Sequence, residues 1–242
     1  MGTWICHLRI AEKLLEKIDG LDPQMFAIGN IAPDSGIPDE NWRTFNPPKH
    51  ITHFGNEDET WGIADLDFYR KYLAEVSPMD RERYSFLLGY FFHLITDNLW
   101  TVEIWRPHKE KYAEWLDRDA DDFVRETKRD WYGLDFIYVR DEPHALFWQV
   151  FLHCTYETNY LDFMPIEAVQ QRVAYIQQFY QQVDDWVQAA YLRPYTYLPQ
   201  ARMDQFVMDT TEKLIGVYKQ LQVQIPDSRT ILAVLDDKKA QP

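Results

Sequence analysis

The segment Phe86-Leu-Leu-Gly-Tyr-Phe-Phe-His-Leu-Ile-Thr-Asp-Asn-Leu-Trp100 decides the fold, because it is apolar on nearly every side. A helix without a polar face is buried rather than lying on a surface. We therefore predict a central helix from about Asp80 to Trp105, ending before Pro107, with the rest of the chain packed around it.

One polar stripe runs along this helix, since Ser85, Gly89, His93 and Asp97 recur at steps of four residues and share a face. A buried ionised carboxylate costs on the order of several kcal/mol unless it is paired or bound to a metal ion. An imidazole and a carboxylate one turn apart can reach the same ion. Asp97 therefore either shares a metal ion with His93 or, in the simpler interpretation, forms a core hydrogen bond with it. Gly89 leaves room on this face for a ligand or another segment.

The chain of 242 residues is long enough to bury the core of one domain, and no Gly/Ser-rich linker divides it. We expect a domain over residues 1–222 and a loosely attached tail over 223–242. The formal net charge of −14 opposes binding to a nucleic-acid duplex or an anionic membrane. Phosphate chemistry on such a protein needs a local cation, and a bound metal ion supplies one.

The sequence predicts a cytoplasmic protein, since residues 1–20 lack the pattern of a signal peptide and no run of about 18 apolar residues indicates a membrane span. Cys6 and Cys154 are then expected to be reduced thiols.

Helical periodicity recurs along the chain and no strand pair is indicated, so we predict an all-α fold, a single-domain multi-helix bundle with a metal site in its core. Long loops are expected over 35–59 and around 131–139, and Thr60 is a candidate helix cap. The expected helices span about 5–18, 22–28, 60–77, 80–105, 108–130, 143–157, 165–191 and 199–221.

Three further segments each offer a side chain of the metal-ligand type. His7 lies on the apolar stripe of the first helix, and Asp34 follows a turn stiffened by Pro33. His53 is flanked by the apolar Phe54 in the long loop. Taken alone, Asp34 is an ordinary turn residue and His53 an exposed polar one. Taken together with the central helix, they form the mixed histidine and carboxylate set from which a helical bundle builds a metal site, and iron or manganese would accept it as well as zinc.

The order of these motifs resembles the zinc-dependent phospholipase C family, whose α-helical fold is shared with the S1/P1 nucleases. The resemblance covers roughly residues 1–105. The motifs that carry it are His7-Leu-Arg-Ile-Ala, Gly-Asn-Ile-Ala-Pro-Asp34, Thr-His53-Phe and Gly-Tyr-Phe-Phe-His93-Leu-Ile-Thr-Asp97.

The resemblance implies a cluster of two or three zinc ions that hydrolyses phosphate esters. It implies that His53, His93 and Asp97 bind one ion, and that His7 and Asp34 bind another, with Asp34 in the position of the general base. Glu103 stands where the family has a histidine, and His153 and Glu157 match the family's second chelating HxxxE motif in form. Six residues precede His7, so Trp4 is not expected to supply the terminal amine that secreted members use as a ligand.

The sequence leaves three functions open. The first is a phospholipase C-like phosphoesterase acting on a phosphate ester such as a phosphodiester. A nuclease or nucleotide phosphatase on the same scaffold is the second, and would need a base-stacking aromatic pocket. The third is a non-catalytic helical interaction protein with a structural metal. The candidates for the aromatic pocket are Trp42, Trp61, Trp100, Trp105 and Trp131.

Overall fold

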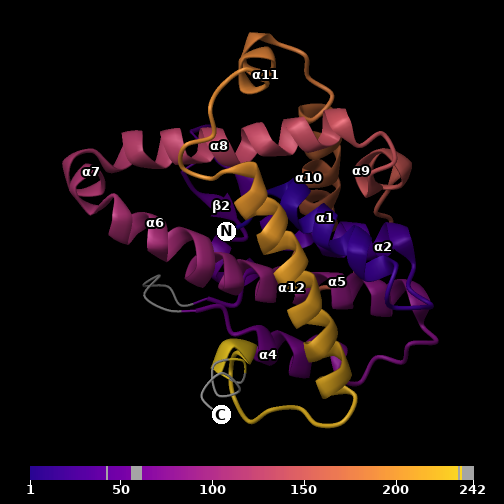
Figure 1. The fold of residues 1–242 in the computed structure, drawn as a ribbon. Coiled ribbons are helices and arrows are strands. Elements are labelled where there is room, and N and C mark those ends of the chain that lie inside the picture. Colours follow the sequence, from indigo (N-terminus) through magenta and orange to yellow (C-terminus); the bar gives the residue numbers. More distant parts are fainter. Residues whose placement is uncertain (42, 56–61, 234, 236–242) are drawn as a thin grey trace.

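The computed structural model describes residues 1–41, 43–55, 62–233 and 235, and these are mostly helical, as predicted (Figure 1). None of the helices in these ranges is both long and apolar enough to cross a membrane. The α-helices are α1 (Trp4–Leu15), α2 (Pro23–Gly29), α3 (Lys49–Thr52), α4 (Asp65–Phe68), α5 (Arg81–Trp100), α6 (Arg106–Lys111), α7 (Ala113–Arg118), α8 (Ala120–Asp141), α9 (Leu146–Gln149), α10 (Ile166–Phe179), α11 (Asp185–Ala190) and α12 (Gln200–Leu221). Shorter helical turns are η1 (Ala32–Asp34), η2 (Tyr69–Leu73), η3 (Thr101–Trp105) and η4 (Phe151–His153).

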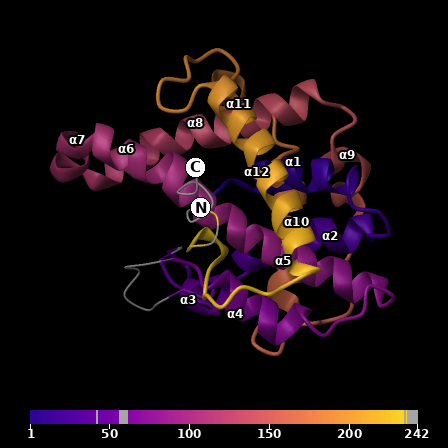
Figure 2. The ribbon, with the colours of Figure 1, turned by 60° about the horizontal axis from the view of Figure 1, so that its bottom comes forward.

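Helix α5 is the central helix that the apolar segment predicts. Every residue from Tyr84 to Trp100 is buried. Helices α1 and α2 pack against it, and α12 crosses in front of it in Figure 1. The helical arm of α6 and α7 projects away from this body in both ribbon views (Figures 1 and 2). The core therefore forms around the stripe of α5 that carries His93 and Asp97.

Two glycines allow α2 and α5 to approach each other at their crossing. A Cβ atom on Gly89 would lie 2.4 Å from the backbone oxygen of Phe26, and one on Gly29 would lie 2.1 Å from that of Phe86. The room predicted beside Gly89 is thus occupied by another segment of the chain, α2. This close packing places Asn30, which follows α2, next to His93.

The structure differs from two sequence predictions in the region of α8. The helix expected over 108–130 is divided at Tyr112 and Asp119 into α6, α7 and α8. The loop expected around 131–139 is instead the second half of α8, because burial of Trp131 and its apolar neighbours in the core outweighs the weak helical period. Pro107 does not end the central helix either, since the π turn η3 precedes it and α6 continues beyond.

The region between α2 and α5 also differs from the prediction. Strands β1 (Ile37–Pro38) and β2 (Phe45–Asn46) form a short antiparallel pair, so the prediction that no strands pair was wrong. Helix α4 begins at Asp65, and the predicted cap Thr60 lies outside the described residues.

Residues 226–231, within the predicted tail, are attached to the body. The side chain of Arg70 donates hydrogen bonds to the backbone oxygens of Pro226 and Ser228, each at 2.6 Å. The buried Ile231 donates its backbone N–H to Asp65.

The helices expected over 143–157 and 165–191 are both interrupted. The first is reduced to α9 and η4, after which Cys154 is extended. The second is divided into α10 and α11, and Asp184 caps α11. Cys154, like Cys6, is a free buried thiol.

A buried carboxylate on α8 gives the fold a pH-dependent stability. Asp135 accepts hydrogen bonds from the hydroxyls of Thr3 at 2.7 Å and Tyr180 at 2.5 Å, and burial raises its pKa to about 7. The folded protein thus binds this proton more tightly than the unfolded chain, so the stabilisation is present at low pH and is lost as the pH rises through 7. The loss from this group between pH 5 and 8 is about 2–3 kcal/mol.

We expect Asp135→Asn to remove that pH-dependent difference in the free energy of unfolding, because asparagine fills the same space and does not titrate. Urea unfolding of both proteins at pH 5 and pH 8 measures it. Parallel pH dependences for the two proteins would contradict the assignment.

Candidate metal centre

Five predicted ligands meet at one buried place in the core. His7 comes from α1, Asp34 from the end of η1, and His53 from the residue after α3. His93 and Asp97 come from adjacent turns of α5. Two overlapping triads have ligand atoms within 4.8 Å of one another: His7, His93 and Asp97, and Asp34, His53 and His93.

Asp97 lies at the centre of this cluster. Its Oδ1 atom is 3.3 Å from Nε2 of His7, and its Oδ2 atom is 3.4 Å from Nε2 of His93 and 3.5 Å from Nε2 of His53. Nε2 of His53 is also 3.4 Å from Oδ1 of Asp34. The His7 and His93 rings stack, with centroids 3.9 Å apart.

These separations are long for hydrogen bonds, which have typical N···O distances of about 2.7–3.2 Å. Among the described residues, the Nε2 atoms of His7, His53 and His93 and Oδ2 of Asp97 have no hydrogen-bond partner. Two ligands of a tetrahedral zinc ion, each bonded at about 2.0–2.1 Å, lie about 3.3 Å apart. The cluster thus has the spacing of atoms that share an ion, and it leaves unsatisfied the atoms that would bind one.

The other ring nitrogen of two of these histidines has a hydrogen-bond partner. Nδ1 of His93 is 2.7 Å from the backbone oxygen of Asn30, so it must carry the proton, and Nε2 of the neutral ring is left with a free lone pair. Nδ1 of His53 is 2.9 Å from the hydroxyl of Thr52. Sequence reasoning missed both partners. Thr52 is adjacent to His53 in sequence, but nothing in the sequence indicates that the carbonyl of Asn30 meets His93.

The electrostatics of the cluster favour ionised carboxylates. Burial alone would raise the pKa of Asp97, yet His93 and the N-terminal amine, together with His53 and His7, hold it well below its usual range. Burial would also raise the pKa of Asp34, but the neighbouring His53 has the larger opposing effect, and the pKa of Asp34 is lowered. Burial lowers the pKa of His7 to about 4, whereas for His53 the nearby carboxylates of Asp34 and Asp97 outweigh burial and raise the pKa. A neutral His7 and two carboxylates are the protonation states that a metal ion requires, and a bound ion would displace the proton that the carboxylates favour on His53.

The N-terminal residues cover one side of the cluster, and Asp34 marks the accessible edge. The backbone N–H of Gly2 donates to Oδ1 of Asp97 at 2.7 Å, and the indole N–H of Trp4 donates to Oδ2 of Asp34 at 3.0 Å. The side chain of Asp34 is 10% exposed, against 1% for Asp97 and 0% for His93. A ligand would therefore approach from the side of Asp34.

The other three predicted ligands lie in different surroundings. Glu103, on η3, forms ion pairs with Lys213 and, at 3.4 Å, with Arg202. His153 and Glu157 are exposed, and because the chain is extended from Cys154 they do not share a helical face as the HxxxE pattern predicts. The triads formed by the described residues include none of the three.

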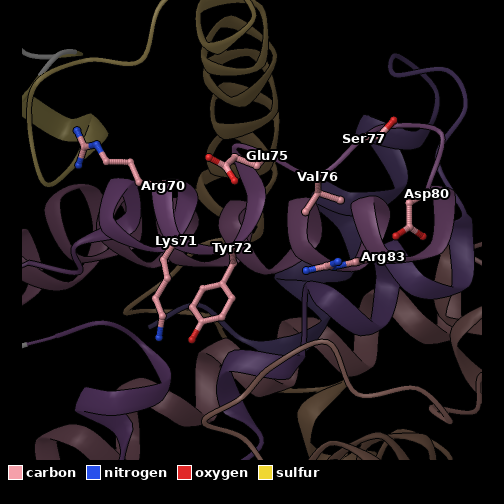
Figure 3. Close-up of a pocket in the computed structure, with 8 residues that line it drawn as sticks. All are labelled: Arg70, Lys71, Tyr72, Glu75, Val76, Ser77, Asp80 and Arg83. Atoms are coloured by element: carbon pink, nitrogen blue, oxygen red, sulfur yellow. The ribbon is translucent and has the colours of Figure 1, made fainter.

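A separate surface pocket of about 360 Å³ lies along η2 and the start of α5, and it contains none of the clustered ligands. Figure 3 shows Lys71 and Tyr72 pointing to the same side of it. Lys71 pairs with Asp162 at 3.6 Å and Arg70 with Asp67 at 3.2 Å, so these charges are already neutralised within the protein.

A scan of protein-family models found no match for this chain, and searches of curated proteins and of solved structures found none either. The fold and the site therefore define only a general class of protein. It is a mostly helical protein with a buried cluster of histidines and aspartates that could hold a metal ion.

Proposed function

We propose that this protein is a metal-dependent hydrolase of phosphate esters, with zinc held by His7, Asp34, His53, His93 and Asp97, and that it is related to the zinc-dependent phospholipase C family. The motif order of residues 1–105 supports the family assignment. The observation that carries the proposal is the convergence of three Nε2 atoms and one carboxylate oxygen, all buried and without hydrogen-bond partners among the described residues.

Asp34 is the candidate catalytic residue, because its carboxylate is at the accessible edge. Bound zinc would polarise a phosphoryl oxygen and lower the pKa of a water molecule towards neutrality. Asp34 stays ionised, and one of its oxygens is oriented by the indole N–H of Trp4. This carboxylate would accept the proton of the attacking water, while His53, His93 and Asp97 hold the ion.

The proposal is tested by elemental analysis and a substrate panel. We expect the protein, after repletion with zinc, to retain at least one equivalent and to hydrolyse a phosphate ester, with the activity lost on chelation. The panel contains a lysophospholipid, a phosphodiester and single-stranded nucleic acid. Less than one equivalent of any transition metal would refute the proposal.

The panel also separates the alternatives. A nuclease would prefer the single strand, but Trp100 and Trp131 are packed in the core against each other and are not available to stack on a base. Trp42 and Trp61 lie outside the described residues. For a non-catalytic protein with a structural metal, His93→Ala and Asp97→Ala would lower stability with no activity to lose.

The hydroxyl of Thr52 gives a more selective test of the histidine ligands. We expect Thr52→Val, which keeps the shape of the side chain but leaves Nδ1 of His53 without its partner, to weaken zinc binding about 10–100-fold. A competition titration with a chelating dye measures the affinity. The matched control is Thr211→Val on α12, which removes a buried hydroxyl that donates to the backbone oxygen of Val207. Equal affinities for the two variants would show that the Thr52 hydroxyl does not support His53 as a ligand.

A further inference from the structure

The accessible edge of the cluster is flanked by two lysines from distant parts of the chain. Lys49 begins α3, the short helix that ends next to His53, and Lys128 lies on α8. In both ribbon views the N-terminus lies between α8 and α5, the helix that carries two of the cluster's ligands (Figures 1 and 2).

Lys49 contacts the N-terminal segment that covers the cluster, and Lys128 lies on α8 close in sequence to a residue that packs against that segment. Nζ of Lys49 is 4.0 Å from Sδ of Met1, and the next residue, Gly2, donates its backbone N–H to Asp97. Lys128 lies one helical turn before Tyr132, whose ring is 5.8 Å from the ring of Trp4. The indole of Trp4 in turn donates to Asp34.

The charges of the two lysines act on each other and on Asp34. Loss of hydration lowers the pKa of Lys128, the positive charge of Lys49 lowers it further, and the carboxylate of Asp34 opposes both effects. Lys49 also contributes to the low pKa of Asp34. The positive charge of Lys49 thus acts on both Lys128 and Asp34, and the carboxylate of Asp34 is also 3.4 Å from Nε2 of His53.

Neither lysine has a carboxylate within ion-pair distance in the described part of the chain, although acidic residues outnumber basic ones by 39 to 25. Among the described residues Lys17 pairs with Glu212, Lys71 with Asp162 and Lys213 with Glu103. Exposed lysines such as Lys219 also have no ion pair there, so what distinguishes Lys49 and Lys128 is that both act electrostatically with Asp34. Two unpaired, mutually repelling cations favour an anion from outside the protein.

We propose that Lys49 and Lys128 bind the free oxygens of a terminal phosphate at the Asp34 edge, so that the substrate class is a small phosphomonoester. This inference rests on the proposed phosphoesterase function and narrows it. A monoester phosphate carries about two negative charges near neutral pH and a diester carries one, so two cations favour the monoester. The net charge of −14 acts against long polyanions at the same site.

The test titrates inorganic phosphate into zinc-treated protein by calorimetry, with the metal content of each sample measured in parallel. We expect Lys49→Met and Lys128→Met each to weaken phosphate binding about five- to twentyfold without changing the metal content. The control is Lys219→Met in the last turn of α12, an exposed lysine with the same charge change, which should bind phosphate within twofold of the original protein. Affinities within twofold for all three variants, or no phosphate binding by the original protein at millimolar concentrations, would overturn the lysine site.

A second measurement keeps this inference separate from the proposed function. We expect Lys128→Met to reduce the preference for para-nitrophenyl phosphate over bis-para-nitrophenyl phosphate, as a ratio of kcat/KM values, about tenfold. An unchanged ratio would overturn the monoester assignment. Phosphate binding that depends on the lysines in a protein that hydrolyses neither ester would refute the hydrolase and leave the anion site standing.

Discussion

Asp97→Asn should abolish both zinc binding and hydrolysis, because this carboxylate contacts three histidines at 3.3–3.5 Å. Removing a residue that only hydrogen-bonds to a metal ligand weakens metal binding about 10–100-fold. Removing the ligand at the centre of the cluster should weaken zinc binding at least as much. A ligand present at about 100 times its Kd adds about 2.7 kcal/mol to the free energy of unfolding. We expect zinc to stabilise the original protein by an amount of this size and to have no such effect on Asp97→Asn.

Urea unfolding with and without zinc, after chelation, measures this increment. Asp130→Asn is the matched control, since Asp130 is an equally buried carboxylate that pairs with Arg193 at 2.9 Å outside the cluster. This control should be less stable than the original protein under both conditions and should still gain the zinc increment. Equal increments for Asp97→Asn and Asp130→Asn would show that Asp97 is not a ligand.

Gly89→Ala should be among the most destabilising single-methyl additions in this protein. The new Cβ atom would lie 2.4 Å from the backbone oxygen of Phe26, and neither helix can relieve this contact by rotating a side chain. Overpacking of this kind costs about 1–3 kcal/mol, and at a backbone contact we expect the upper end of that range or more. Moving α2 away would also stretch the hydrogen bond between Asn30 and His93, so zinc affinity should fall together with stability.

Gly216→Ala on α12 is the control of opposite sign. Nothing lies within 4 Å of a Cβ atom at Gly216, so alanine there should stabilise the helix, by up to about 1 kcal/mol. Urea unfolding of both variants measures the two changes. A Gly89→Ala protein as stable as the original would mean that α2 and α5 do not cross as closely as described.

The sequence alone was sufficient to predict the buried central helix, the all-α class and the inward positions of His7, His93 and Asp97. These predictions rest on short-range periodicity, which local sequence determines. The helix expected over about 22–28 is confirmed as α2, and its start is also set locally, since Asp22 caps it and Pro23 is its first residue. Where the period was weak, as in the second half of α8, packing of Trp131 in the core decided the structure and the local prediction was wrong.

Only the tertiary structure decided how the candidate site is assembled. Spacing along one helix can place His93 beside Asp97, but the approach of α1, η1 and α3 to that helix depends on contacts between residues far apart in sequence. The approach of α2 depends on the glycines at its crossing with α5. The same kind of long-range contact brings the carbonyl of Asn30 to His93. It also pairs Glu103 with Lys213 and Arg202, so that Glu103 does not join the cluster. The physical reason is that a side chain's partner is set by three-dimensional proximity, which local sequence patterns do not encode.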